Sequence, residues 1–204
     1  MLRAELDCRA IPGPSPRALK GWSRNDLPEF FARVGFKTGA EIGVWEGAFT
    51  EQFCKAGMQM LAVDPWKAYP EYLDHTRPDL IAGAYETAGA RLAPYGCEIY
   101  RDFSAVAAPY VDDGSLDFVY IDGNHSFFDV VQDLTLWAPK VRSGGIICGH
   151  DYRQFRRSLN IRVVEAVNAY TLAHDIDPWY VLGRDRVRKG EVRDRERSFL
   201  WVQP

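Results

Sequence analysis

The chain has 204 residues, of which 47% are hydrophobic and 13% aromatic, which is enough apolar surface for one large core and argues against a disordered chain. Its 25 basic and 28 acidic residues give a net charge of −3, so no overall positive field marks a nucleic-acid-binding protein. Composition therefore predicts one folded domain that could meet a polyanion only at a local basic patch.

The cysteines and the N-terminal stretch indicate the cellular compartment in which the protein is expected. The four cysteines are widely separated and include no CxxC pair, which indicates reduced thiols in a cytosolic protein. The stretch MLRAELDCRAIPGPSP lacks the continuous apolar core of a signal peptide, and no apolar run approaches the ~18 residues of a membrane-spanning helix. We therefore expect a soluble, cytoplasmic protein with no membrane partner, and homo-oligomer formation stays open.

The chain is expected to begin with an arm followed by a helix. Residues 1–21 are rich in proline and weakly patterned, which predicts an arm that either lies on the body or is partly mobile. Ser23 and Asp26 can form a capping box, and apolar residues follow at helical spacing until Gly35 ends the helix. One folded domain is predicted over residues 22–204.

Strand and helix signals then alternate. Strands are expected at AEIGV (40–44), QMLAVD (59–64), CEIY (97–100), DFVYID (117–122) and the IICG that follows residues 143–145. Helices are expected over 49–56, over 79–92, from a capping box at Ser126 and Asp129 to Pro139, and near 161–170. Short strands separated by helices predict an α/β fold, a doubly wound, Rossmann-like, mostly parallel sheet with right-handed crossovers.

Two of these helices have a predicted core face. The inward residues are Leu80, Ala84, Ala88 and Leu92 in the first, and Phe127, Val130, Val131, Leu134 and Trp137 in the second.

The end of the chain predicts a C-terminal antiparallel hairpin. WYVLG (179–183) and SFLWV (198–202) are typical of strands and are joined by a charged turn. This turn and the arginines of YRQFRR (152–157) allow two interpretations. Arg153, Arg156 or Arg157 could meet an anionic substrate or partner, or the charges could form ordinary solvated surface, which is favoured.

The first strand-to-helix turn is where such sheets receive a cofactor, beyond the carboxyl ends of the strands. This turn resembles a dinucleotide-binding turn in its residues Glu41, Gly43 and Gly47. Trp45, however, occupies the position where a second glycine would let the backbone approach a pyrophosphate. S-adenosylmethionine (SAM) has no phosphate and escapes this restriction. The turn therefore favours SAM, with an NAD-dependent oxidoreductase or a non-catalytic nucleoside-binding module as the alternatives.

Asp64 ends the second strand, where an acidic side chain can accept both hydroxyl protons of a ribose. This supports a nucleoside without choosing between SAM and NAD. The alternative is a turn residue before Pro65.

These motifs together resemble a known family. The pattern Glu41-x-Gly43-x-x-x-Gly47, then Asp64, then YIDGNHSFFDVVQDLTLWAPKVRSGGIICGHDY (120–152), resembles class I SAM-dependent methyltransferases. More narrowly it resembles methyltransferase family 24, which is related to macrolide-sugar and cephalosporin O-methyltransferases, over roughly residues 22–155.

The resemblance implies the class I fold, SAM as cofactor and methyl transfer to a hydroxyl of a small-molecule acceptor, with N-methyl transfer to an amine as the competitor. It also implies an adenine contact after the third strand, for which Asp102 is the candidate. The predicted cofactor-binding residues are Glu41, Gly43, Trp45, Gly47, Asp64, Asp102 and Asp122.

Acidic and imidazole groups follow two adjacent strands. Asp122 ends one strand, and His150 and Asp151 end the next, so the three can converge as ligands of Mg²⁺, Mn²⁺ or a similar ion. Related O-methyltransferases commonly hold a metal with an acidic residue and then an acidic pair at these strand ends. This chain departs from that pattern at His150, and a hydrogen-bonded cluster without metal is the alternative.

His125 is the predicted catalytic base. Methyl transfer to an alcohol requires removal of the hydroxyl proton, for which an imidazole is suited. His125 also lies where related metal-dependent enzymes place a basic residue. The alternative is a histidine that only bonds around the helix cap at Ser126.

Overall fold

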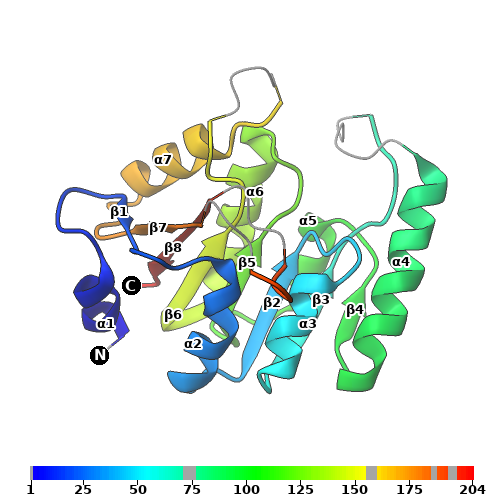
Figure 1. Cartoon of the computed structure of the whole chain (residues 1–204). Coiled ribbons are helices and arrows are strands. Elements are labelled where there is room, and N and C mark those ends of the chain that lie inside the picture. Colours follow the sequence, from blue (N-terminus) through cyan, green and yellow to red (C-terminus); the bar gives the residue numbers. More distant parts are fainter. Residues whose placement is uncertain (1, 71–76, 155–159, 185–187, 193–196) are drawn as a thin grey trace.

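A computed structural model describes residues 2–70, 77–154, 160–184, 188–192 and 197–204 (Figure 1). Their strands form one eight-stranded sheet of order β1-β7-β8-β6-β5-β2-β3-β4. The strands are β1 (Arg17–Ala18), β2 (Thr38–Ile42), β3 (Gln59–Val63), β4 (Glu98–Tyr100), β5 (Leu116–Ile121), β6 (Val141–Gly149), β7 (Tyr180–Leu182) and β8 (Ser198–Val202). The helices are α1 (Leu2–Arg9), α2 (Leu27–Arg33), α3 (Ala48–Lys55), α4 (Pro78–Leu92), α5 (Ser104–Ala107), α6 (Phe127–Trp137) and α7 (Val163–Ala173).

The predicted fold class is confirmed. All neighbouring strands run parallel except β8, which is antiparallel to both β6 and β7. The predicted antiparallel pairing of the last two strands is therefore present, and β8 is inserted between β6 and β7. The expected elements recur with ends shifted by a few residues, and the predicted capping box forms at Ser23 with Asp26. At Ser126 half of the predicted box forms: the Ser126 hydroxyl accepts from the Asp129 N–H, but the Ser126 N–H donates to Asn124.

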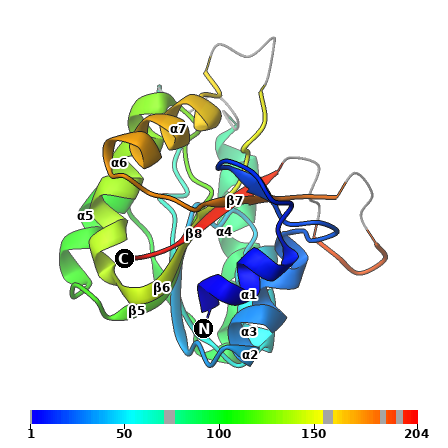
Figure 2. The ribbon, with the colours of Figure 1, turned by 90° about the vertical axis from the view of Figure 1, so that its left-hand side faces the viewer.

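Helices cover both faces of the sheet, as Figure 2 shows with the sheet seen nearly on edge. One core cluster joins the sheet to α1, α2, α3 and α4, and contains the buried rings of Phe30, Phe53 and Phe118. The other joins it to α5, α6 and α7, and contains Trp137 and Trp201. The central strands are buried on both faces, which explains their continuous apolar sequences.

The predicted arm lies on the body, one of the two alternatives. Leu6 of α1 is fully buried, and β1 pairs in parallel with β7 through Arg17 opposite Tyr180. The arm thus adds an edge strand to the sheet. Two residues are too few to show the alternation that identifies a strand in sequence.

Two residues predicted to face the core are instead exposed. Leu80 is 47% exposed, and Ile81 is buried in its place together with Ala84 and Ala88. Phe127 is 45% exposed because it belongs to the first turn of α6, which begins beyond the carboxyl edge of β5 where no strand covers it.

The strand register determines where the polar residues lie. Ile42 pairs with Val63 on one side and with Ile121 on the other, and Ile121 pairs with Gly149 of β6. The last residues of β3, β2, β5 and β6 are therefore in line. The residues that follow them, Asp64, Gly43, Asp122 and His150, meet at one edge of the sheet.

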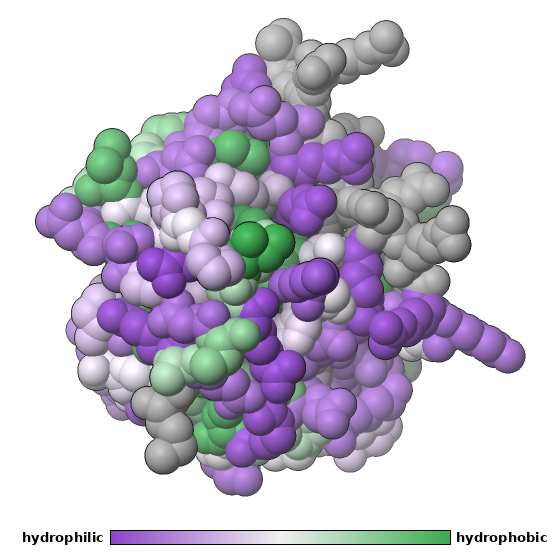
Figure 3. Space-filling view, turned by 60° about the vertical axis from the view of Figure 1, so that its left-hand side comes forward, coloured by the Kyte–Doolittle hydropathy of each residue, from purple (hydrophilic) through white to green (hydrophobic). Residues whose placement is uncertain are grey.

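Over the described residues, no helix is long and apolar enough to cross a membrane. On the face shown in Figure 3, hydrophilic side chains predominate and the hydrophobic ones among the described residues occur in small, separate groups.

Candidate functional site

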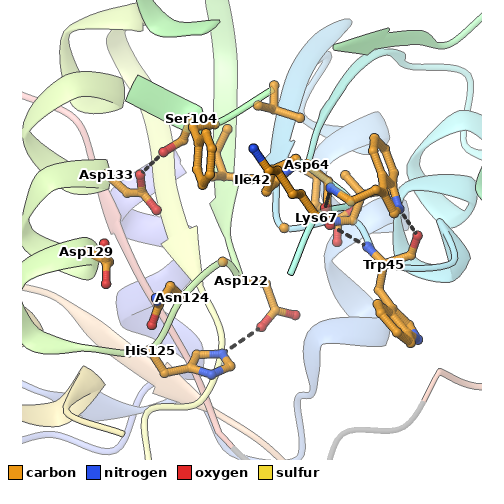
Figure 4. A pocket seen from close by; sticks show the side chains of 18 of the residues that line it. Ile42, Trp45, Asp64, Lys67, Ser104, Asp122, Asn124, His125, Asp129 and Asp133 are labelled. Carbon is orange, nitrogen blue, oxygen red and sulfur yellow. Dashed lines mark hydrogen bonds and ion pairs between the residues drawn. The ribbon is translucent and has the colours of Figure 1, made fainter. Parts of the chain in front are cut away.

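A cavity of about 1040 Å³ opens at this edge of the sheet. Its walls come from the turn after β2, the loops after β3, β4 and β5, and the first turns of α6 (Figure 4). The lining includes six of the predicted site residues that surround the strand ends, namely Glu41, Gly43, Trp45, Asp64, Asp122 and His125.

The turn after β2 has the close approach that its glycine suggests. Gly43 has φ 85°, and a Cβ there would clash with the backbone carbonyl of Asp122. Gly47, also at positive φ, precedes the first residue of α3. Trp45 adopts φ 52°, a conformation that costs free energy for a bulky residue, and its carbonyl accepts a hydrogen bond of 2.8 Å from the Trp66 indole. The close contact of Gly43 with Asp122 and the hydrogen bond from Trp66 to Trp45 therefore fix the backbone conformation of this turn.

Asp64 holds this turn to the next strand. One carboxylate oxygen accepts hydrogen bonds from the backbone N–H groups of Val44 (2.9 Å) and Trp45 (3.0 Å), and the other accepts from Trp66 (2.7 Å). The bond to Trp66, two residues ahead, is an Asx turn, so the structural role considered for Asp64 is present. The carboxylate also lines the cavity.

Glu41 is 2% exposed, and the Thr50 hydroxyl of α3 donates a hydrogen bond to its carboxylate. Burial raises the pKa of Glu41 to about 8, although the bond from Thr50 acts in the opposite direction. A carboxyl with this pKa is largely protonated at neutral pH. Glu41 therefore ties β2 to α3 as a mostly neutral group in the cavity wall.

The predicted adenine contact lies apart from the cavity lining. Asp102 accepts a hydrogen bond of 2.7 Å from the backbone N–H of Phe103, and Phe103 and Ser104 line the cavity in its place. The Ser104 hydroxyl bonds to Asp133 of α6, and burial raises the pKa of Asp133 to about 7 (Figure 4). The role of Asp102 stays a prediction, and Ser104 with Asp133 forms a polar group that the sequence did not indicate.

Acids and histidines converge where β5 and β6 end. His125 Nε2 lies 3.0 Å from Asp151 Oδ2 and 3.6 Å from Asp122 Oδ1. His150 Nδ1 lies 3.2 Å and 3.7 Å from the same two carboxylates. The expected convergence of Asp122, His150 and Asp151 is present, and His125 belongs to the same cluster.

Asp151 is ionised in this cluster. Burial alone would raise its pKa, but the two imidazoles beside it outweigh burial and hold the pKa of Asp151 well below its usual range. Asp151 also adopts φ 55°, a strained backbone conformation that turns its carboxylate toward the histidines. The cluster can therefore stabilise positive charge, either on a protonated imidazole or on a metal ion.

Sequence reasoning missed Arg24, which also lines the cavity. Arg24 precedes α2 and is 8% exposed, with its Nη1 3.2 Å from Asp122 Oδ2 and its guanidinium 4.9 Å from the centre of the Phe49 ring. Burial alone would lower the pKa of Arg24, but the buried Tyr120 and Asp122 outweigh it and raise the pKa above its ordinary value. An arginine inside a helix-capping turn is normally solvated, so no sequence pattern marks it.

The basic segments give no test of the anion-binding hypothesis. Arg153 is exposed, whereas Arg156 and Arg157 lie outside the described residues, as does much of the charged turn of 184–197. In the described part of that turn, Arg184 pairs with Glu191 and lies 3.4 Å from Asp26.

A family model described as a methyltransferase domain, that of methyltransferase family 24, matches residues 40–152 of the chain. A comparison with curated proteins gives no match.

Solved structures share the fold at low sequence identity. The O-methyltransferase TomG from Streptomyces achromogenes, involved in tomaymycin synthesis and in complex with SAM, has a TM-score of 0.61 and 14% identity, covering 100% of this chain and 86% of its own. An O-methyltransferase from Bacillus cereus, in complex with S-adenosylhomocysteine (SAH), has a TM-score of 0.60 and 14% identity over 98% of this chain and 86% of its own. Cofactor-bound Rv0187 from MTB has a TM-score of 0.61 and 15% identity over 98% and 87%. At these identities the similarity establishes the class I methyltransferase fold.

Proposed function

The chain belongs to methyltransferase family 24, and on that premise we propose that it transfers a methyl group from SAM to a hydroxyl group of a small molecule. The observation that carries the proposal is the convergence of Asp64, Gly43 and His125 on one cavity at the carboxyl edge of the sheet. Solved methyltransferases of the same fold with SAM or SAH bound support the choice of cofactor.

The cavity fits a nucleoside cofactor with a second molecule beside it. Its ~1040 Å³ is at the upper end of the roughly 300–1,000 Å³ usual for pockets that hold one small ligand. At one side the Asp64 carboxylate, which lines the cavity, would meet the ribose hydroxyls. Gly43 lines the cavity and packs directly against the Asp122 backbone, which places the turn after β2 in the cavity wall beside Asp122.

SAM supplies a methyl group bonded to a positively charged sulfur. As the acceptor oxygen bonds to the methyl carbon and the carbon–sulfur bond breaks, the hydroxyl proton passes to His125. Asp122 and Asp151 stabilise the imidazolium that results, because their carboxylates lie within 3.6 Å and 3.0 Å of its Nε2. An amine acceptor needs less help from a base, so this arrangement supports a hydroxyl acceptor.

The cofactor assignment is tested by ligand-induced stabilisation. We expect SAH to raise the melting temperature of the protein by several degrees at a hundredfold excess over Kd, and NAD at equal concentration to leave it unchanged, because Trp45 occupies the place where a diphosphate requires glycine. Stabilisation by NAD and not by SAH would overturn the proposed function.

As an alternative to the base role of His125, we propose that Asp122, His125 and Asp151 hold a divalent ion. Among the described residues, their ligand atoms all lie within 4.8 Å of one another. Two donors on one ion at about 2.1 Å are ~3 Å apart when adjacent and ~4.2 Å when opposite, so the set fits after small rotations of the side chains. His150 approaches the same carboxylates with Nδ1. A bound ion would supply positive charge that favours an ionised acceptor oxygen.

Calorimetric titration tests the metal proposal without an acceptor. Mn²⁺ is expected to bind the wild-type protein and not the Asp151→Ala variant, because that carboxylate is ionised and central to the cluster. Asp113→Ala removes an exposed carboxylate that pairs with Lys140 and serves as the control. Undiminished Mn²⁺ binding by Asp151→Ala, or turnover that survives complete chelation, argues against the site.

A further inference from the structure

Arg24 is a buried cation in the wall of the proposed cofactor cavity. Two of the described residues that line the cavity are lysine or arginine, namely Arg24 and Lys67. Lys67 is exposed, and it follows Asp64 by three residues. Arg24 is 8% exposed and is carried by the turn that precedes α2, before the segment matched by the family model.

The guanidinium is held at the far side of the turn from Asp64. It lies over Phe49 in the first turn of α3 and 3.2 Å from Asp122, next to Gly43. Its neighbour Glu41 has a pKa of about 8 and supplies little negative charge at neutral pH. Asp122 is shared, since its other oxygen faces His125 and His150. A second anion beside Arg24 would therefore be favoured electrostatically.

The shape of SAM identifies that anion. If the ribose is held by Asp64 and the sulfur lies near His125, the amino-acid part extends past Gly43 to the side where Arg24 lies. This part is a zwitterion, and its α-carboxylate is the only anionic group of SAM. Arg24 and Asp122 present a cation and an anion 3.2 Å apart, which is the complement of a carboxylate and an ammonium group. The partial positive charge at the start of α3 adds to the attraction for a carboxylate.

We propose that Arg24 binds the α-carboxylate of SAM and so distinguishes the full cofactor from nucleosides that lack the amino-acid part. The inference rests on the proposed function, because it assumes that SAM occupies this cavity. It assigns a cofactor-positioning role to the turn before α2, which the family model does not cover.

Two ligands separate this role from a structural one. SAH carries the amino-acid part, and 5′-methylthioadenosine keeps the adenine, ribose and sulfur but lacks the amino-acid part. In Arg24→Met the Kd for SAH measured by calorimetry is expected to rise about 10- to 100-fold, the usual effect of a lost hydrogen bond between charged groups. The Kd for methylthioadenosine is expected to change by less than about threefold.

Arg24→Lys keeps the charge but loses the planar pair of donors. It is expected to weaken SAH several-fold without changing methylthioadenosine binding. If Arg24→Met does not fold, Arg24→Lys tests carboxylate binding in its place. This variant is expected to fold because the lysine still provides a counter-charge for Asp122. Arg33→Met, which removes an exposed arginine of α2, is the matched control and should bind both ligands as the wild type does.

The outcomes separate this inference from the proposed function. If the wild type binds neither ligand, SAM is not the cofactor. If the wild type binds SAH and Arg24→Met binds it equally well, or loses both ligands to the same extent, Arg24 does not bind the carboxylate. A selective loss of SAH in Lys67→Met would place the carboxylate at the exposed cation and also overturn the inference.

Discussion

Replacing His125 with alanine is expected to lower turnover by about 10²- to 10⁴-fold, the usual contribution of a general base, and to leave the Kd for SAH within about threefold of wild type. The reason is that His125 faces Asp122 and Asp151 at the acceptor side of the cavity and not the proposed ribose site at Asp64. Turnover is measured as SAH release, with an acceptor found by screening alcohols and phenols.

His174→Ala provides the matched control, since His174 follows α7, is exposed and packs against the Tyr170 ring in a tilted arrangement. Its turnover should equal that of the wild type. Added imidazole should restore part of the turnover of His125→Ala if the missing group is a base. Loss of Mn²⁺ binding in His125→Ala, with no rescue by imidazole, would show that the ring serves as a metal ligand. Full activity in His125→Ala excludes the base role.

Replacing Asp64 with alanine is expected to weaken SAH binding by at least ~100-fold. Two effects add: the ribose loses its carboxylate acceptor, and the turn after β2 loses the hydrogen bonds that Val44 and Trp45 donate to Asp64. Hydrogen bonds to a charged group contribute about 1.5–3 kcal/mol each, so the loss of even one or two accounts for this factor. Calorimetry with SAH measures it, and thermal unfolding should show a lower melting temperature.

Asp117→Ala separates the two effects. Asp117, at the start of β5, likewise accepts hydrogen bonds from two backbone N–H groups, those of Lys37 (2.6 Å) and Thr38 (3.0 Å), but lies at the opposite edge of the sheet. It should lower the melting temperature as Asp64→Ala does while leaving the Kd for SAH unchanged. If both variants weaken SAH binding equally, Asp64 acts only through the stability of the fold.

Much of the site follows from strand order and strand ends. Short apolar strands that each end in a polar residue are enough to predict that Asp64, Asp122 and His150 lie at one edge of a parallel sheet. The register confirms this edge, because the last residues of β3, β2, β5 and β6 lie opposite one another. The acid–histidine cluster was predictable for the same reason, since β5 and β6 are neighbours.

The residues that line the cavity after β4, on the proposed adenine side, could not be predicted in this way. Asp102 follows a strand of three residues, so a shift of one position decides whether Asp102 or its neighbour lines the cavity. Phe103 and Ser104 occupy that place, and Ser104 bonds to Asp133 from a helix that begins more than twenty residues later in the chain. Nothing local in the sequence links these two residues.

The amino-acid sequence by itself determined the alternation of strands and helices, the sheet class and the chemistry at the strand ends. These depend on hydrophobic periodicity and on residues that are close together in the chain. Only the tertiary structure decided that the arm adds an edge strand beside β7 and that Arg24 reaches Asp122. Both are contacts between distant segments whose free energy depends on burial and on charges brought together by folding, and no local pattern records them.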